Sequence, residues 1–400
     1  MVMKTATSLI LLLLLFAVLA VGGRAKISRE LTTINYGDGI CHLMVETQGY
    51  TCEEHMVTTK DGYILSLQRI PTGRSGATTK GGPKPPVLLQ HGLMSDAMTW
   101  LAMSPDESLG FILADNGFDV WLGNVRGTNY SSSHTLINSV NPLYWDWSWD
   151  ELVAYDLPAM VEYVHDQTGQ KLHYVGHSLG TLMAFGAFSK HEVLSMVRSA
   201  ALLSPIAYMG QMPSPLARAA ADQFTAEATR WSGIQVFAPG GGPATQLVAN
   251  ICSHMDCSNM ENVLTGPNCC MNKSRSNLAP QQPTSTKNMI HLSQMIRKGS
   301  IAMYDYGNEG ANIMHYGQAT PPAYSITSIP NQLPLFLSYG GEDLLSDVKD
   351  VQTLIDALSD HDQDKLVVQY REDYAHMDFV LGVNAKELVY SPLMAFFKLN

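Results

Sequence analysis

A serine between two glycines is the strongest chemical signal in the sequence. Gly176, Ser178 and Gly180 form a Gly-x-Ser-x-Gly pattern between an expected strand at 172–175 and an expected helix at 179–188. The pattern alone arises by chance in about one in ten chains of this length, given the usual abundance of glycine. Between a strand and a helix, however, it indicates a tight turn that exposes the serine hydroxyl as a nucleophile.

A serine nucleophile requires a base, and the base requires an acid that orients it. When the serine lies in such a turn, the chain order is Ser, then Asp or Glu, then His. Asp343 ends the segment Gly-Gly-Glu-Asp at 340–343, just past an expected strand at 333–339, so we predict that it is the acid, with Glu342 as the alternative. Asp347 and Asp350 are expected to be solvated charges on a helix surface.

Two histidines follow these acids in the chain. His361 lies within the polar stretch 359–364, which predicts a surface loop. His376 follows an expected strand at 366–370 and has apolar neighbours, so we predict that it is the general base. The alternative, a histidine packed in the core without a chemical role, is disfavoured because the other two members of the set occur in the required order.

The charge that develops on the substrate oxygen requires backbone N–H donors. We expect one donor from Leu179, directly after the nucleophile. The other is expected from Leu93, which follows the apolar run 87–90 and a His-Gly pair. His91 itself is expected to have a structural role.

Several segments of the chain closely resemble the acid lipases, the α/β-hydrolase family that contains gastric lipase, lysosomal acid lipase and many plant relatives. They are His-Gly-Leu at 91–93, the segment 116–127 that ends in Gly-Asn-Val-Arg-Gly, Tyr-Asp-Leu-Pro-Ala at 155–159, Gly-His-Ser-Leu-Gly at 176–180 and Gly-Gly-Glu-Asp at 340–343. The segment 116–127 is far more specific than the serine motif. The resemblance covers nearly all of the chain that follows residue 25.

The resemblance implies hydrolysis of triacylglycerols and other esters at a lipid surface, without a cofactor, beneath an inserted domain that carries a lid. By the same resemblance, Ser178, Asp343 and His376 match the catalytic triad, and Leu93 and Leu179 match the oxyanion positions. Animal members usually carry Gln where this chain has Leu179, which changes the polarity of the pocket but not the backbone donor. The cysteines at 252–270 also depart from the family, so the resemblance implies nothing about the lid geometry.

The sequence around these residues alternates between strand and helix patterns, which predicts an α/β fold with a mainly parallel sheet, as in the α/β-hydrolases. Expected strands lie at 57–59, 63–70, 87–89, 118–122, 172–175, 333–339 and 366–370, and expected helices at 111–115, 150–165, 179–188 and 347–358. Residues 206–330 interrupt this rhythm and contain expected helices at 217–231 and 286–297. We therefore predict a core at 26–205 and 331–400, with an inserted, Met-rich cap and lid at 206–330, called the insert below.

The first 25 residues have the pattern of a secretory signal peptide, with Lys4, an apolar run at 10–21 and small residues after it. This run is shorter than the roughly 20 residues that span a bilayer, so an anchor helix is the less favoured alternative, and no later segment is expected to span. We expect a secreted, extracellular protein, with the vacuole or lysosome as the alternative. A hydrophobic share of 46% excludes general disorder, and a net charge of −11 disfavours nucleic acid as a partner.

Secretion favours disulfides over a metal site for the six cysteines, Cys41, Cys52, Cys252, Cys257, Cys269 and Cys270. A zinc site formed by the last four is the alternative, but no Cys-x-x-Cys spacing occurs, so no metal is predicted. The sequence does not fix the pairing, but we expect one bridge between Cys41 and Cys52 and two within 252–270. Asn129 and Asn272 are predicted N-glycosylation sites, and the second lies in the more loop-like stretch.

These observations predict a secreted serine lipase that hydrolyses the ester bonds of triacylglycerols. Sterol esters or short soluble esters are the alternative substrates, because the lining of the insert decides between them. A catalytically silent hydrolase that binds lipid or a protein is a third hypothesis, which the ordered set of serine, acid and histidine disfavours. The expected partners are a lipid ester and a lipid–water interface.

Overall fold

The computed structural model describes residues 39–75, 82–238, 252, 259–271 and 281–400. The expected signal peptide at 1–25 lies outside these residues, as do Cys257 and Asn272. Among the described residues, no helix is both long enough and apolar enough to cross a membrane.

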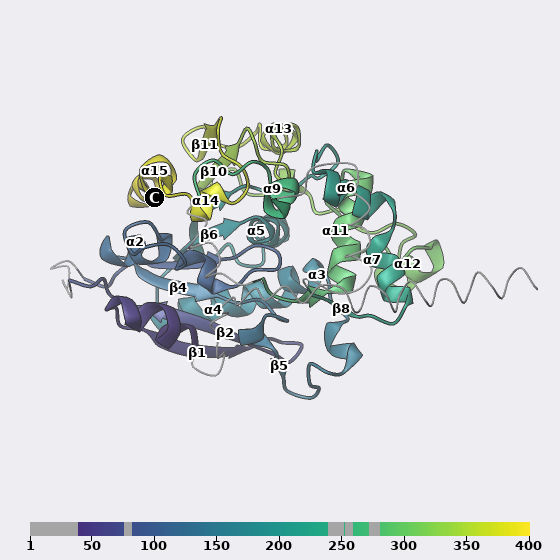
Figure 1. The fold of residues 1–400 in the computed structure, drawn as a ribbon, viewed down its shortest axis with the longest axis horizontal. Coiled ribbons are helices and arrows are strands. Elements are labelled where there is room, and N and C mark those ends of the chain that lie inside the picture. Colours follow the sequence, from purple (N-terminus) through teal and green to yellow (C-terminus); the bar gives the residue numbers. More distant parts are fainter. Residues whose placement is uncertain (1–38, 76–81, 239–251, 253–258, 272–280) are drawn as a thin grey trace, which may run out of the picture. The chain divides into compact units, whose positions relative to one another are not determined.

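A nine-stranded sheet contains most of the strands, in the order β1-β2-β4-β3-β6-β7-β10-β11, with β5 paired to β2 (Figure 1). β2 runs antiparallel to β1, β4 and β5, and all other neighbours are parallel. This arrangement confirms the expected mainly parallel sheet. The strands are β1 (Glu53–Thr58), β2 (Tyr63–Ile70), β3 (Pro86–Gln90), β4 (Asp119–Gly123), β5 (Ser133–His134), β6 (Leu172–His177), β7 (Val197–Leu203), β10 (Leu335–Gly340) and β11 (Leu366–Arg371).

Helices connect the parallel strands of this sheet. A π-helical turn, η7 (Leu152–Asp156), joins helices α3 and α4 into one helical stretch. This stretch agrees with the helix expected at 150–165. The core helices are α2 (Leu109–Asp115), α3 (Trp149–Glu151), α4 (Leu157–Thr168), α5 (Leu179–Ser189), α13 (Val348–Ala357), α14 (Asp378–Leu381) and α15 (Ser391–Leu399).

Apolar side chains cover both faces of the sheet. Leu88 of β3 is aligned with Trp121 of β4 and Tyr174 of β6, and these three side chains belong to a buried cluster that includes residues of α4, α5 and α13. On the opposite face, the ring of Phe397 in α15 stacks on His173 of β6 at 4.3 Å between ring centroids. Strands buried on both faces have continuous apolar sequences, which is why most of these strands could be predicted.

The insert contributes helices and a short strand pair between β7 and β10. Its helices α6, α7, α11 and α12 lie together at the right of Figure 1. Its described elements are α6 (Pro215–Asp222), α7 (Thr225–Trp231), β8 (Val236–Phe237), α9 (Met260–Thr265), β9 (Thr284–Ser285), α11 (Thr286–Lys298) and α12 (Glu309–Tyr316).

The prediction of one helix over 217–231 is wrong. Phe224 adopts a left-handed backbone conformation, with φ of +52°, which ends α6 and starts α7. The guanidinium of Arg297 in α11 lies 4.2 Å from the centroid of the Phe224 ring. The break lets both short helices pack against α11, and such a tertiary contact is not visible in the helical periodicity of the sequence.

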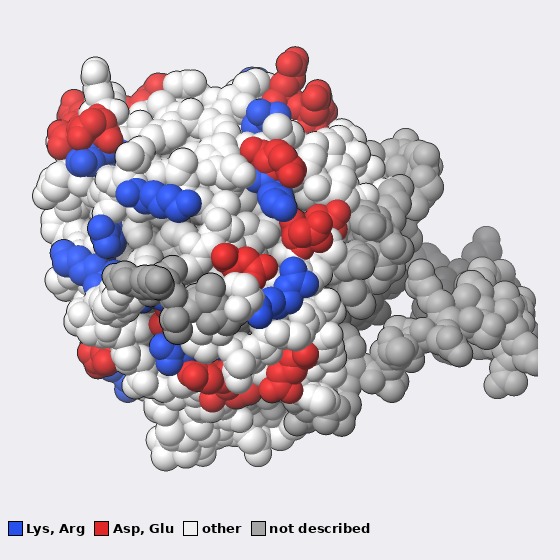
Figure 2. Space-filling model, turned by 90° about the vertical axis from the view of Figure 1, so that its left-hand side faces the viewer, with Lys and Arg blue, Asp and Glu red and all other residues white. Residues whose placement is uncertain are grey.

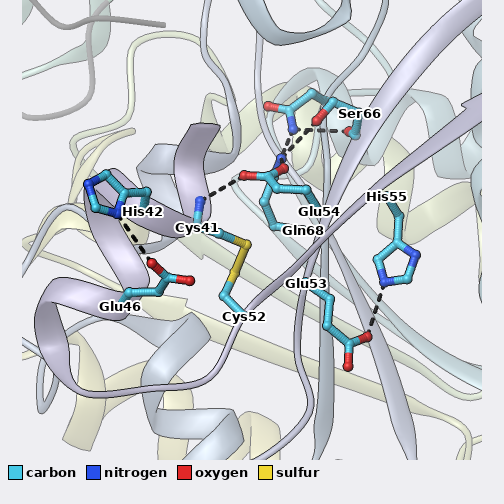
Figure 3. Close-up of a disulfide and its surroundings, with 10 residues drawn as sticks. Cys41, His42, Glu46, Cys52, Glu53, Glu54, His55, Ser66 and Gln68 are labelled. Carbon is cyan, nitrogen blue, oxygen red and sulfur yellow. Dashed lines mark hydrogen bonds and ion pairs between the residues drawn. A yellow bond between two sulfur atoms is a disulfide. The ribbon is translucent and has the colours of Figure 1, made fainter. Parts of the chain in front are cut away.

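A disulfide between Cys41 and Cys52 lies beside the antiparallel edge of the sheet (Figure 3). This is the pairing expected from the sequence. Glu54 of β1 links the same region to the sheet, because its carboxylate accepts from the Cys41 N–H at 2.8 Å and from the Gln68 amide at 2.6 Å. The bridge and the carboxylate together hold the segment before β1 against the sheet.

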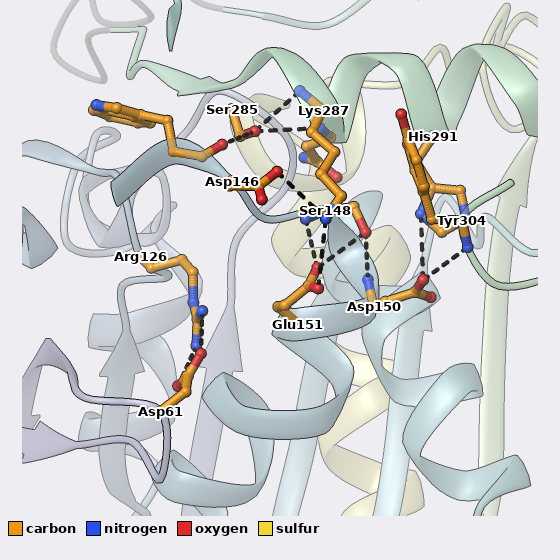
Figure 4. A network of polar contacts seen from close by, with 12 residues as sticks. Asp61, Arg126, Asp146, Ser148, Asp150, Glu151, Ser285, Lys287, His291 and Tyr304 are labelled. Atoms are coloured by element: carbon orange, nitrogen blue, oxygen red, sulfur yellow. Dashed lines mark hydrogen bonds and ion pairs between the residues drawn. The ribbon is translucent and has the colours of Figure 1, made fainter. Parts of the chain in front are cut away.

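The Gly-Asn-x-Arg-Gly motif places a buried arginine between two acids. The guanidinium of Arg126 donates to Asp61 in the β1–β2 turn, at 2.6 and 2.9 Å (Figure 4). It also donates to Asp156 at the start of α4, at 2.7 Å. Its charge also lies 3.8 Å from the centroid of the Tyr63 ring. Paired in this way, Arg126 joins three loops or element ends that are far apart in the sequence.

A second polar cluster joins the insert to the core (Figure 4). Asp150 of α3 accepts hydrogen bonds from the Tyr324 hydroxyl at 2.7 Å and from the Tyr304 N–H at 2.8 Å. Nδ1 of His291, on α11, lies 3.9 Å from the same carboxylate. Burial raises the pKa of Asp150 to about 6 and lowers the pKa of His291 to about 3.

Charges of both signs share the face of the molecule shown in Figure 2. On this face, the described Lys and Arg side chains lie among Asp and Glu side chains and do not form a separate basic patch. Nucleic-acid backbones bind to surfaces where basic residues dominate, and this face does not have that character.

Candidate active site

Ser178 lies at the turn between β6 and α5. Its backbone is strained, with φ of +54° and ψ of −117°. A Cβ at Gly180 would lie 2.5 Å from the Gln90 carbonyl oxygen, and a Cβ at Gly176 would lie 2.8 Å from the Gly180 backbone. Both glycines of the motif are therefore required by close backbone packing, and the turn is the strand-to-helix turn that the sequence predicted.

Asp343 and His376 form a buried pair at the ends of β10 and β11. Nδ1 of His376 lies 3.0 and 2.9 Å from the two carboxylate oxygens of Asp343. Because an ionised carboxylate only accepts, Nδ1 carries the proton and Nε2 is left as the basic nitrogen of the neutral ring. This is the tautomer that a general base for a serine requires.

The charge of Asp343 is stabilised by its neighbours. Burial opposes ionisation, but His376 and the backbone N–H groups of Ser346 and Leu345, each 2.8 Å from Oδ1, outweigh it. The net result is a pKa of Asp343 below its ordinary value. Asp343 therefore keeps its charge more readily than an ordinary aspartate and can orient His376.

The loop that carries His376 is bonded to the turn that carries Ser178. Nε2–H of His177 donates to the His376 carbonyl at 2.9 Å, and the two imidazole rings lie 4.8 Å apart between centroids. The hydroxyl of Ser204 donates to the same carbonyl at 3.3 Å. Burial lowers the pKa of His177 to about 3, so His177 is neutral and serves as a hydrogen-bond donor rather than as a second base.

Several residues weighed from the sequence lie elsewhere. The Glu342 side chain is exposed. The prediction that His361 lies on the surface is wrong: it is 6% exposed, and its Nε2–H donates to the Leu333 carbonyl, before the start of β10. The site lies at the other end of that strand, so His361 is a structural histidine. Its polar sequence neighbours concealed this burial.

The prediction that Asp347 and Asp350 are solvated charges is also wrong. Asp347 caps the N-terminus of α13 by accepting from the Lys349 and Asp350 N–H groups. Asp350 accepts from the Gln211 N–H at 2.8 Å, and both carboxylates are buried. The contact with Gln211 comes from the insert, and helical periodicity cannot reveal such a contact.

Leu93 lies in a loop that approaches the serine closely. A Cβ at Gly92 would lie 3.0 Å from the Ser178 Cβ. His91 holds this loop through the Gly92 carbonyl, 2.8 Å from Nδ1, and the Val125 N–H, 3.3 Å from Nε2. Burial lowers the pKa of His91 to about 4, which agrees with the expected structural role. Leu93 and Leu179 line the same small cavity, of about 10 Å³, so the structure brings the two expected oxyanion positions together.

The insert reaches the loops that carry Asp343 and His376. The Thr265 carbonyl, at the end of α9, accepts from the His376 N–H at 3.2 Å and from the Leu344 N–H at 3.4 Å. Oδ1 of Asn268 accepts from the Met377 N–H at 3.0 Å. Sequence reasoning missed these residues, because backbone acceptors and loop amides have no distinctive pattern.

Adjacent cysteines follow this segment. Cys269 and Cys270 form a disulfide, and their N–H groups donate to the buried Asp378 carboxylate at 3.1 and 3.0 Å. Cys269, Cys270 and Asp378 are the one group of described residues close enough together to hold a metal. Both sulfurs are oxidised in the disulfide, so they cannot act as thiolate ligands. Cys252 is also disulfide-bonded, and the remaining cysteine lies outside the described residues.

This geometry defines the class of protein as an α/β-hydrolase. Residues 85–382 match the family described as alpha/beta hydrolase fold, and residues 41–104 match the one described as partial alpha/beta-hydrolase lipase region. A soluble variant of monoglyceride lipase from Saccharomyces cerevisiae has the same fold, with a TM-score of 0.57 and 14% identity over 87% of this chain and 96% of that one.

More specifically, the chain belongs to the acid lipase family of carboxylic ester hydrolases. It is 51% identical to triacylglycerol lipase 2 of Arabidopsis thaliana, over 90% of this chain and 88% of the relative. Triacylglycerol lipase 1 of the same plant is 42% identical, over 90% of this chain and 91% of the relative. Human lysosomal acid lipase/cholesteryl ester hydrolase is 35% identical, over 86% of this chain and 87% of the relative.

Proposed function

We propose that the chain is a secreted serine lipase that hydrolyses triacylglycerols through Ser178, His376 and Asp343. The observation that carries this proposal is the buried His376–Asp343 pair, attached through His177 to the strained turn of Ser178. The names of the two plant relatives support the same substrate class.

In the proposed reaction, Nε2 of His376 takes the proton of the Ser178 hydroxyl as its oxygen attacks the ester carbonyl carbon. The N–H groups of Leu93 and Leu179 stabilise the oxyanion that forms. His376 then donates the proton to the departing alcohol oxygen, and an acyl-serine remains. Water, deprotonated by His376, attacks this acyl group and releases the fatty acid and the free serine. The sequence of steps requires no metal and no cofactor.

The insert is proposed to be the cap and lid over an acyl-binding groove. Large apolar side chains are exposed on its described helices, among them Trp231 on α7 and Met314 on α12, at 82% and 88% exposure. Contiguous exposed apolar residues are typical of surfaces that bind lipid or another protein. We propose that these exposed apolar side chains meet the lipid–water interface, with sterol esters and short soluble esters as the alternative substrates.

The proposed destination is the extracellular space, with the vacuole or lysosome as the alternative. The signal-like residues 1–25 and the Cys41–Cys52 bridge support passage through an oxidising compartment. Asn129 is exposed and, with Asn272, is proposed to carry glycans. Digestion of the secreted protein with an N-glycosidase, followed by peptide mass mapping, tests both sites.

The enzyme proposal is tested by a hydrolysis panel. The full secreted chain is assayed on p-nitrophenyl esters of rising acyl length and on emulsified triolein and cholesteryl oleate. Ser178→Ala should fold and be secreted but lose turnover, because no other group supplies the nucleophile. A rate of Ser178→Ala within tenfold of wild type would show that the nucleophile is misassigned.

A further inference from the structure

One side chain of the insert, Gln282, is completely buried between loops of the core. Its Nε2 donates to Oδ2 of Asp96 at 2.6 Å, and its Oε1 accepts from the Asn129 N–H at 3.0 Å. Its backbone N–H donates to the Met94 carbonyl at 2.9 Å. Gln282 thus joins the loop after β3 to the loop after β4 through three hydrogen bonds.

We propose that Gln282 is a positioning residue that holds the oxyanion loop, residues 92–96, in the conformation that aims the Leu93 N–H at the substrate oxygen. The inference rests on the proposed function, because Leu93 is the proposed donor. It assigns to the insert a second role besides covering the site: a side chain of the insert fixes part of the catalytic apparatus of the core.

The backbone of the oxyanion loop requires such support. Met94 has a left-handed conformation, with φ of +54°, although it is not a glycine. Such a conformation is strained and persists only where the surroundings hold it. The Met94 carbonyl is held by the Gln282 N–H, one residue after Leu93. That bond is made by the backbone, so the Gln282 side chain acts on Met94 by keeping the backbone of residue 282 in place through its bonds to Asp96 and Asn129.

The far end of the loop is held by the same glutamine. Asp96 caps the short helix η4 (Ala97–Trp100) through Oδ1, which accepts from the Met98 N–H at 2.9 Å, and uses Oδ2 for Gln282. Asp96 is fully buried, and burial raises its pKa to about 7. A buried carboxyl group that loses its donor is strongly destabilised, so without the Gln282 amide this end of the loop should rearrange.

The position of the cavity agrees with this assignment. Pro283 and Thr284, the residues after Gln282, line the small cavity together with Leu93 and Leu179. The segment that carries the glutamine therefore lines the same space as the two proposed oxyanion donors. A displacement of about 1 Å at such a site is sufficient to lower the rate on the order of 100-fold.

The test compares Gln282→Ala with a matched variant of the insert, Asn312→Ala. Asn312 is also a buried carboxamide with several hydrogen bonds, but its partners Tyr306, Asp305 and Ala319 all lie in the insert. For both variants we measure kcat and KM on a p-nitrophenyl ester, Tm, and deuterium uptake of peptides that span residues 91–100. Deuterium uptake reports on the loop whether or not the protein hydrolyses esters.

We expect Gln282→Ala to lower kcat on the order of 10- to 100-fold, with KM changed less than about threefold, because an oxyanion donor acts mainly in the transition state. Deuterium uptake at 91–100 should rise. Asn312→Ala should lower Tm to a similar extent, but without the loss of kcat and without the rise in deuterium uptake at 91–100. Equal losses of kcat in the two variants, or unchanged uptake at 91–100 in Gln282→Ala, would overturn the inference.

Gln282→Glu keeps the shape of the side chain and provides a second test if the alanine variant folds poorly. At about pH 5 the new carboxyl group can share a proton with Asp96, whereas at about pH 8 both ionise and repel each other. The kcat of Gln282→Glu relative to wild type should therefore fall as the pH rises, and a constant ratio would count against the inference. A wild-type protein inactive on every ester would refute the proposed function instead, and deuterium uptake would still decide the role of Gln282.

Discussion

Gly266 of the insert lies directly against the carbonyl oxygen of Glu342, the residue before Asp343. A Cβ at position 266 would collide with this oxygen, and Gly266 also has a left-handed backbone, with φ of +102°. Its neighbour Thr265 bonds to the loops of both the acid and the base. The insert therefore supports the Asp343–His376 pair as well as the loop at residues 92–96.

Gly266→Ala should consequently impair catalysis. The added methyl group displaces the Glu342 carbonyl and, with it, Asp343, so kcat should fall on the order of tenfold or more. Steady-state kinetics on a soluble p-nitrophenyl ester measure this loss.

Gly307→Ala is the matched control. Gly307 also lies in the insert with positive φ, +88°, but a Cβ there meets nothing within 4 Å. Both variants strain the backbone by roughly 1–3 kcal/mol and should lower Tm, yet only Gly266→Ala should lower kcat. Unchanged kcat in Gly266→Ala would mean that the contact with Glu342 does not position the acid.

Substitution of His376 and substitution of His361 should have very different effects on kcat. His376→Ala removes the proposed base, and Asp343→Asn removes the acceptor that orients it. Each should lower kcat by several powers of ten, because the members of a triad act as a unit. The measurement is kcat on the same soluble ester, with Tm as a check on folding.

His361→Ala serves as the control for that pair. His361 is buried and bonded to Leu333, so its loss should destabilise the protein by about 1–3 kcal/mol and leave kcat of the folded fraction nearly unchanged. Should His361 prove essential and His376 dispensable, the assignment of the base is wrong.

Acidification should strengthen the contact between insert and core at Asp150. The pKa of Asp150 is about 6 in the folded protein, above its ordinary value of 3.8, so the folded state binds this proton more tightly. Its contribution to stability is therefore present at low pH and is lost as the pH rises through about 6. Relative to Asp150→Asn, which cannot titrate, wild type should gain about 1.4 kcal/mol between about pH 7 and pH 5.

Urea unfolding of both proteins at the two pH values measures this difference. Buried neutral histidines, such as His177 and His291, oppose the trend, since acid protonates them only in the unfolded chain. The comparison removes the effect of His177, whereas His291 contacts the Asp150 carboxylate and its contribution remains part of the measured difference. Asp364→Asn, at an exposed site, should show no such dependence, and a pH-independent difference for Asp150→Asn would contradict the prediction.

Much of the sheet and the order of the site residues could be predicted from the sequence. Runs such as Val87 to Leu89 are apolar at every position because both faces of their strands are covered, and Gly176 and Gly180 report the steric limits of the Ser178 turn. Local sequence is sufficient for these features, since their causes lie within a few residues.

The rest depends on contacts between distant segments. Phe224 ends a helix whose sequence favours continuation, His361 is buried within a polar stretch, and Gln282 is one of two adjacent glutamines in an unremarkable loop. Neither composition nor periodicity distinguishes a glutamine that bonds Asp96 from one that faces water. The residues that couple the insert to the core were accordingly invisible before the structure.

Acyl length should separate a lipase from a simple esterase. Burial of each methylene in an apolar groove contributes about 0.8 kcal/mol, or about fourfold in kcat/KM. We therefore expect kcat/KM to rise from butyrate through octanoate towards oleate esters until the groove is filled. Activity should also increase abruptly once the substrate exceeds its solubility, because only an interface stabilises an exposed apolar lid surface.

The increase in activity at the interface should depend on exposed apolar residues of the insert. Trp231→Ala and Met314→Ala remove large side chains that are 82% and 88% exposed, so both should reduce activity on emulsified triolein while leaving hydrolysis of dissolved p-nitrophenyl butyrate unchanged. Val367→Ala, on strand β11 of the core and 40% exposed, should affect neither substrate. Fastest turnover on soluble butyrate without an increase at the interface would instead assign the chain to the short-chain carboxylesterases.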